Sequence, residues 1–353
     1  MILLDGVTPE TAGVSRETLL LSRMVQDPAL SLIDRVESYE DIINLEVGDT
    51  SFTRARNLER EHGVRQLFLK FEGNNPTGTQ KDRIAFGQCH DALRRGFDSI
   101  TVATCGNYGA ALSLASKLAG IRCIIYIPEN YHTPRVREME QNGAVVIRYS
   151  GSYEESVKYS IEQAQENDWY DANPGGLNTS LQIASYAEIA HEIYDVLRDA
   201  PKIVAAPVSN GTLLAGVYRG FVSLYKRGRT SRIPRMIAAS SSHKNPIIYS
   251  FKKNLEQCID LVPEKIRETR INEPLINWHS FDGDEALYAI RESGGRAFNI
   301  SDEKMHRLTR QLKEKEGLNL LPASTAGLGA LLELNSQEAF EPDRYVIILT
   351  GKK

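Results

Sequence analysis

The sequence predicts an α/β protein with two three-layer domains built on mainly parallel sheets. Short apolar segments alternate repeatedly with segments of helical spacing, and the apolar segments are continuous rather than strictly alternating. Continuous apolar strands are buried on both faces, which is typical of parallel sheets covered by helices. The length of 353 residues is enough for two such cores.

Units of strand, loop and helix follow one another along the chain. After a polar lead at 15–45 with helical spacing, the run QLFLKFEG at 66–73 predicts a strand, and Ile84–Arg95 predicts a helix. The later units read SITVATCGNYG then AALSLASKLAG, RCIIYIP then PRVREMEQNG, AVVIRYSG then YEESVKYSIEQAQEN, KIVAAPVSNG then TLLAGVYRGFVSLYKRG, and RMIAASSSH. The chain closes with DEKMHRLTRQLKEKEG, PASTAGLGALLEL and a last strand in YVIILTG.

Three consecutive units fall between about 91 and 190, and they are able to close on themselves as an inserted domain. The turn-rich stretch DWYDANPGGLN leads from them into a long helix, as expected where a chain re-enters its first domain. We therefore expect a large domain formed by 1–90 and 191–353, with a small mobile domain, 91–190, inserted into it.

Composition limits the partners. Lys and Arg number 42 against 46 Asp and Glu, a net charge of −4, which gives no field to attract nucleic acid or an anionic membrane. The four cysteines show no metal-ligand spacing, so we expect no metal and a reducing, cytoplasmic location. No apolar run approaches the roughly 18–20 residues that span a bilayer, and the basic start of a secretion signal is missing.

Three loops follow predicted strands and precede predicted helices, the position at which open α/β sheets bind ligands. They read EGNNPTGTQK, TCGNYG and PVSNGTLLAG. Each precedes a helix N-terminus, which is able to bind an anion. Gly73 and Gly78 have the glycine spacing of a nucleotide phosphate loop, but Lys81 stands two residues too late for one. No dinucleotide fingerprint follows a strand either.

Lys81 lies just before the predicted helix at Ile84–Arg95, at an amino end where the dipole disfavours a cation by roughly 0.3–1 kcal/mol. A solvated surface lysine is one interpretation. The other is an amine among turn backbone that loses its proton and forms a Schiff base with a carbonyl compound.

Together the loops resemble those of the fold type II pyridoxal-phosphate enzymes, in the threonine synthase and threonine dehydratase branch. NPTGTQKDR at 75–83 resembles that branch's NPTGSFKDR, which implies that Lys81 is the catalytic lysine bonded to the cofactor. TCGNYGAAL at 104–112 resembles the S-x-G-N-x-G-x-A loop, which implies that Asn107 binds the cofactor and that the stretch from 104 to 108 binds the substrate carboxylate. That stretch comprises Thr104, Cys105, Gly106, Asn107 and Tyr108.

Further motifs extend the resemblance over roughly 45–351. PVSNGT resembles the loop around the cofactor phosphate, which implies this role for Ser209, Asn210, Gly211 and Thr212. VIILTG resembles the last strand, whose hydroxyl residue faces the pyridine nitrogen and corresponds to Thr350. GDTSFTRARNL at 48–58 and PASTAGLGAL at 322–331 are weaker matches.

The residues supply what pyridoxal 5'-phosphate requires: an amine, an anion-binding helix start and a partner for the ring. A hydroxyl at the ring nitrogen favours elimination or replacement over transamination. We expect a lyase acting on a small amino acid, most like a threonine synthase that converts O-phosphohomoserine to threonine, and we expect a homodimer. Open alternatives are a serine/threonine dehydratase, a β-replacement synthase using serine or an activated serine, and a non-catalytic relative that binds cofactor or amino acid.

Several positions depart from the threonine synthase pattern and concern the substrate more than the cofactor. NPGGLN at 173–178 has no arginine where those enzymes usually have one for the substrate phosphate. Tyr108 is bulky where threonine or alanine is usual, and Ser209 replaces a glycine. The sequence therefore leaves the substrate open.

Overall fold

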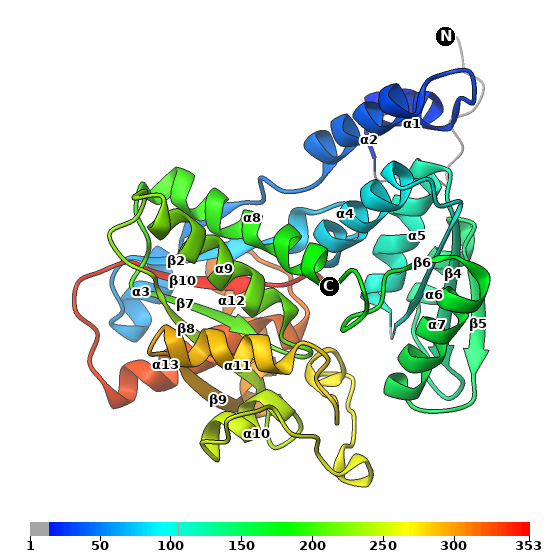
Figure 1. Ribbon diagram of the computed structural model, residues 1–353. Coiled ribbons are helices and arrows are strands. Elements are labelled where there is room, and N and C mark those ends of the chain that lie inside the picture. Colours follow the sequence, from blue (N-terminus) through cyan, green and yellow to red (C-terminus); the bar gives the residue numbers. More distant parts are fainter. Residues whose placement is uncertain (1–13, 105) are drawn as a thin grey trace. The chain divides into compact units, whose positions relative to one another are not determined.

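A computed structural model describes residues 14–104 and 106–353 and contains two compact units (Figure 1). One unit comprises the described residues up to Gly48 together with Asn75–Leu181, and the other comprises Asp49–Asn74 and Gln182–Lys353. This division differs from the boundaries expected at 90/91 and 190/191. The helix that begins at Lys81 packs on the helix that begins at Asn107, so it belongs to the unit that the sequence placed after residue 90.

The first unit contains a four-stranded, all-parallel sheet in the order β5-β4-β3-β6. Its elements are α1 (Arg16–Gln26), α2 (Leu32–Glu46), α4 (Lys81–Arg94), β3 (Ser99–Ala103), α5 (Asn107–Ala119), β4 (Arg122–Pro128), α6 (Arg135–Gln141), β5 (Val145–Tyr149), α7 (Tyr153–Asn167) and β6 (Tyr170–Asp171). The connections from β3 to β4 and from β4 to β5 run one way across the sheet, and the connection from β5 to β6 runs back. Because parallel crossovers are right-handed, α5 and α6 cover one face and α7 covers the other.

The second unit contains a six-stranded sheet in the order β1-β2-β10-β7-β8-β9, parallel except for β1. Its elements are β1 (Phe52–Arg54), α3 (Arg56–His62), β2 (Leu67–Phe71), α8 (Thr179–Leu197, from Gln182 onward), β7 (Ile203–Pro207), α9 (Thr212–Lys226), β8 (Arg235–Ser241), α10 (Pro246–Lys252), α11 (Gly283–Glu292), β9 (Arg296–Ile300), α12 (Asp302–Glu316), α13 (Ala326–Gln337) and β10 (Tyr345–Leu349). A core of buried apolar residues joins this sheet to α3, α12 and α13. The predicted α/β class with mainly parallel sheets is confirmed.

The helix starts show why these segments become helical. Ser15, Ser31, Ser152 and Ser301 each cap a helix by accepting a hydrogen bond from a backbone N–H in the first turn. Ser152 and Glu155 form a complete capping box at the start of α7. No described helix is long and apolar enough to cross a membrane.

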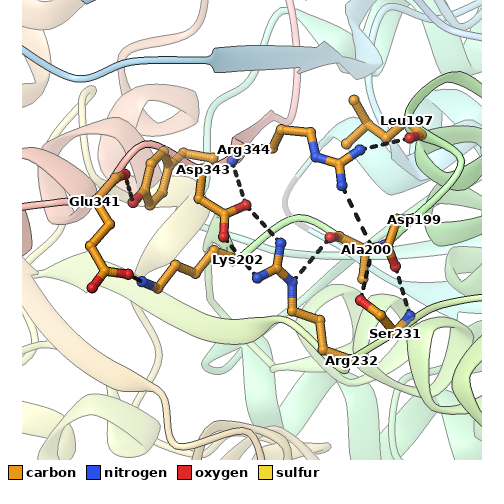
Figure 2. Close-up of polar contacts among 10 residues, drawn as sticks. Leu197, Asp199, Ala200, Lys202, Ser231, Arg232, Glu341, Asp343 and Arg344 are labelled. Atoms are coloured by element: carbon orange, nitrogen blue, oxygen red, sulfur yellow. Dashed lines mark hydrogen bonds and ion pairs between the residues drawn. The ribbon is translucent and has the colours of Figure 1, made fainter.

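A group of charged side chains joins the segments that lead into β7, β8 and β10 (Figure 2). Arg232 makes two hydrogen bonds to the Asp343 carboxylate, each 2.7 Å long. Burial acts to raise the pKa of Asp343, but hydrogen bonds from Arg232 and from the backbone N–H of Arg344 outweigh it and hold the pKa below its usual range.

Asp343→Asn is expected to remove a pH-dependent part of the stability. Because the pKa of Asp343 is depressed in the folded state, its contribution is present above the unfolded value of about 3.9 and is lost as the pH falls through the folded value. Chemical unfolding at neutral pH and near pH 3 measures this effect. The free-energy difference between wild type and Asp343→Asn should shrink at the lower pH, and an equal difference at both pH values would contradict the assignment.

Candidate functional site

Lys81 is the first residue of α4 and follows the tight turn formed by NPTGTQ. Gly78 has a left-handed φ of +85°, and its N–H donates to the Asn75 carbonyl at 2.8 Å. The Lys81 N–H donates to the Thr79 hydroxyl at 3.2 Å. The backbone around the lysine is therefore fixed by contacts within the turn itself.

Asp82, beside the lysine, is a buried carboxyl group that the sequence analysis did not single out. It accepts hydrogen bonds from the Thr77 N–H at 3.0 Å and from the Thr77 hydroxyl at 2.9 Å. Burial raises the pKa of Asp82 to about 7, while the hydrogen bonds from Thr77 act in the opposite direction. Asp82 closes the turn that presents Lys81; the sequence shows an Asp after the lysine but not that the chain folds back on it.

The loop at 104–108 joins β3 to α5 in the same unit as Lys81. The Thr104 N–H donates to the Tyr126 carbonyl at 3.0 Å, and its hydroxyl accepts from the Gly106 N–H at 3.2 Å. Gly106 has a φ of +146°, and Asn107 begins α5, whose amino end is suited to an anion. Cys105 lies outside the described residues.

Tyr108 is buried, and its ring lies beneath the Lys81 amine. The Nζ atom is 5.4 Å from the ring centroid, within the range of a cation–π contact. The Tyr108 hydroxyl donates to the Ala172 carbonyl at 2.9 Å, so the bulky side chain is anchored in the NPGGLN region. The structure thus brings Lys81 together with the loop expected to bind substrate.

NPGGLN itself supports the end of β3. The Asn173 Oδ1 atom accepts from the Ala103 N–H at 2.8 Å, and its Nδ2 atom donates to Asp171 at 2.7 Å. Asn173 is completely buried. This stretch therefore stabilises the end of β3. It also lacks the arginine of the threonine synthase pattern.

The loop expected to bind the phosphate follows β7 and leads into α9 in the second unit. Ser209, Asn210 and Gly211 precede the helix, and Thr212 is its first residue. Thr350 follows β10, which pairs with β7 in parallel, so both segments lie at the carboxyl edge of one sheet. Neighbouring carboxyl ends of parallel strands are where α/β sheets bind ligands.

These donors suit the phosphate and ring of pyridoxal phosphate. Gly211 has a φ of +100°, and an added Cβ would lie 2.7 Å from the Ala286 Cβ and 2.8 Å from the Asp282 carbonyl oxygen. Only a glycine fits this turn, which leads into the amino end of α9. No group of three or more His, Cys, Asp or Glu within the described ranges is arranged to hold a metal ion.

Gly211→Ala is expected to destabilise the protein, because its Cβ would collide with the Ala286 side chain and the Asp282 backbone. Gly228→Ala is the matched control: Gly228 also has a positive φ, +67°, but its added Cβ would have no heavy atom within 4 Å. The control should cost about 1–2 kcal/mol from backbone strain alone, and Gly211→Ala about 1–3 kcal/mol more from the collisions. Thermal unfolding of both variants measures this, and equal losses would contradict the close packing.

Solved structures with the same fold are found over nearly the whole chain. A threonine deaminase from T.th. superposes with a TM-score of 0.74 and 19% identity, covering 90% of this chain and 97% of that one. A serine racemase from Dictyostelium discoideum gives a TM-score of 0.72 and 18% identity, covering 92% and 98%. The predicted fold type II architecture is confirmed.

Sequence relatives and a family model cover the same extent. A threonine synthase from Methanocaldococcus jannaschii is 29% identical over 322 residues, 89% of this chain and 76% of that protein. A threonine synthase from Halalkalibacterium halodurans is 29% identical over 316 residues, covering 88% and 83%. The model described as "Pyridoxal-phosphate dependent enzyme" matches residues 43–351. The chain therefore belongs to the pyridoxal-phosphate dependent enzymes, the family that its three loops resemble.

Proposed function

We propose that the protein catalyses elimination or replacement on a small amino acid, with a threonine synthase-like conversion of O-phosphohomoserine to threonine as the leading reaction. The cofactor of the family is pyridoxal 5'-phosphate, as predicted. The observation that carries the proposal is Lys81, held at the start of α4 by a closed turn and facing the loop that precedes α5. The threonine synthase relatives support the choice of reaction.

Lys81 would hold the cofactor through its Nζ atom, with Asn107 beside it. Ser209, Asn210, Gly211 and Thr212 would surround the phosphate, and Thr350 would face the pyridine nitrogen. When bound, the cofactor withdraws electrons from the Cα atom of an attached amino acid, which makes the α-proton acidic.

The protein's own groups would then bind the substrate and move its protons. The backbone N–H groups of the loop at 104–108 and the amino end of α5 would bind the carboxylate. The Lys81 Nζ atom would take the α-proton as general base and return a proton at the end of the reaction. Tyr108 would shield the amine from water on one side.

We propose that Arg135 would take the place of the arginine that NPGGLN lacks if the substrate is phosphorylated. A Cβ added to Gly106 would lie 3.7 Å from the Arg135 Cγ atom, so this side chain borders the substrate loop. Its guanidinium donates to the Thr77 carbonyl at 2.9 Å and to Glu138 at 2.7 Å, and thereby also touches the turn before Lys81. An arginine is well suited to binding a phosphate through two hydrogen bonds.

The second candidate is a dehydratase or β-replacement synthase acting on serine, threonine or an activated serine. The bulky, anchored Tyr108 favours it, because its buried ring occupies space beside Lys81 that a longer substrate would need. In either case we propose a homodimer in the cytoplasm.

A substrate panel separates these reactions. The purified holoenzyme is supplied with O-phosphohomoserine, O-phosphoserine, serine and threonine, and phosphate, keto acid, ammonia and new amino acids are measured. Phosphate release with threonine formation supports the leading proposal, whereas keto acid from serine or threonine supports the second. No turnover of any of the four would overturn both the threonine synthase and the dehydratase reactions.

A further inference from the structure

Three asparagine side chains form a continuous hydrogen-bonded chain behind the phosphate loop of the second unit. The Asn245 Nδ2 atom donates to the Asn277 Oδ1 atom at 3.0 Å, and the Asn277 Nδ2 atom donates to the Asn210 Oδ1 atom at 3.1 Å. Asn245 and Asn277 are buried, with 1% and 4% of their surfaces exposed. Asn210 is the member that belongs to the loop.

The backbone fixes the orientation of the first amide. The Asn245 Oδ1 atom caps α10 by accepting from the N–H groups of Ile247 and Ile248 at 3.1 and 3.3 Å. Its Nδ2 atom lies 3.0 Å from the Ser209 carbonyl oxygen, which is able only to accept. If the oxygen and nitrogen of Asn245 were exchanged, its NH₂ group would face the N–H donors of α10 and its oxygen would face the Ser209 carbonyl oxygen.

The second amide is fixed in the same way. The Asn277 Nδ2 atom lies 2.8 Å from the His279 carbonyl oxygen, so this atom has to be the donor, and the Asn277 Oδ1 atom receives the proton from Asn245. The Asn277 Nδ2 atom also lies 2.9 Å from the Ser280 hydroxyl, so its second proton is shared between that hydroxyl and Asn210. The group of Asn210 that faces Asn277 is its oxygen, because an NH₂ group there would oppose donor to donor. Backbone groups that bond Asn245 and Asn277 therefore decide which end of the Asn210 amide faces Asn277.

We propose that Asn245 and Asn277 are positioning residues that orient the Asn210 amide so that its NH₂ group, and not its oxygen, is directed to the cofactor phosphate. This inference rests on the proposed function of the loop. An amide nitrogen is a donor to an anion, whereas an amide oxygen would repel one. Asn277 does not need to touch the cofactor to set its affinity.

The hydroxyl of Thr212, unlike the Asn210 amide, is directed away from the proposed phosphate position. This hydroxyl donates to the buried Asp282 side chain. The Thr212 hydroxyl proton is therefore directed to Asp282 and not to the phosphate. The side-chain hydrogen bond to the phosphate would then come from Asn210. Asn277 and Asp282 lie far from the loop in sequence and have no motif that marks them.

Asn277→Asp tests the relay. Aspartate keeps the size of the side chain and still accepts from Asn245, but a carboxylate is unable to donate to Asn210. The Asn210 amide would rotate to give its NH₂ to the aspartate and turn its oxygen outward. Binding of pyridoxal 5'-phosphate and of pyridoxal, which has no phosphate, is measured on the apoprotein. The dissociation constant for the phosphorylated compound should rise by about 10-fold or more, and that for pyridoxal by less than about 3-fold.

Two comparisons show that the effect passes through Asn210. Asn272→Ala is the matched control, because Asn272 is a buried amide of the same irregular segment that bonds Asp302 instead of the loop; it should leave the ratio of the two constants unchanged. In an Asn210→Ala background, Asn277→Asp should cause no further change in that ratio. If Asn277→Asp does not fold, Asn277→Leu, which removes the donor without adding charge, provides the same test.

The outcomes separate the relay from the function. The relay is overturned if Asn277→Asp has the wild-type ratio of the dissociation constants for pyridoxal 5'-phosphate and pyridoxal, or if the affinity for both compounds falls equally. Either result leaves the proposed function standing. A wild-type protein that binds no pyridoxal 5'-phosphate overturns the proposed function itself.

Discussion

Lys81→Ala is expected to abolish covalent attachment of the cofactor and to lower turnover by about 10⁴-fold or more, because one amine is proposed as both anchor and general base. Steady-state turnover of the substrate found in the panel measures this loss. Lys117→Ala is the control, since Lys117 lies in the last turn of α5, away from the loop that precedes this helix, and should retain wild-type turnover. A Lys81→Ala variant with more than a tenth of wild-type activity would contradict the assignment.

Breaking the buried ion pair between Lys70 and Glu192 is expected to give the largest loss of stability. Lys70 lies in β2 with 1% of its side chain exposed, and it pairs with Glu192 of α8, which is 15% exposed. The Lys70 Nζ atom also donates to the Thr50 carbonyl at 2.6 Å. Because removal of one partner leaves a buried charge, Lys70→Met or Glu192→Gln should each cost about 3–5 kcal/mol of unfolding free energy.

The double variant and a surface pair complete this test. Replacing both residues by apolar ones, Lys70→Met with Glu192→Leu, should recover most of the loss, because neither charge is left buried. The more exposed pair of Lys304 and Glu333 is the control, and Lys304→Met should cost no more than about 1 kcal/mol. Chemical unfolding provides all four values, and equal losses for Lys70→Met and Lys304→Met would contradict the role of burial.

The sequence predicted most strands and the loops after them because continuous apolar runs and glycine-bounded turns are local signals. β2, β3, β4, β7 and β10 all form within the predicted segments. α4 begins at Lys81, three residues before the predicted start at Ile84, because the turn closed by Asp82 allows the helix to begin there. β9 was not predicted, since RAFNI is short and becomes a strand only by pairing with β8.

Long-range contacts explain what the sequence could not show. A lysine is almost never fully buried unless it is paired, and the partner of Lys70, Glu192, lies 122 positions later in the sequence. The domain boundaries depended on the packing of α4 against α5, which no linker marks. Asn277 and Asp282 contact the loop at 209–212 from an irregular segment without a periodic pattern. The motifs suggest the candidate site residues, and these assignments stay predictions, whereas the residues that support the loops could be found only from the fold.

Borohydride reduction of the purified holoenzyme, followed by peptide mass mapping, shows directly whether Lys81 carries the cofactor. We expect a yellow protein, loss of the colour on reduction, and one peptide that carries the phosphopyridoxyl group on Lys81. A colourless protein that takes up no pyridoxal 5'-phosphate, or a label on a different lysine, would contradict this expectation.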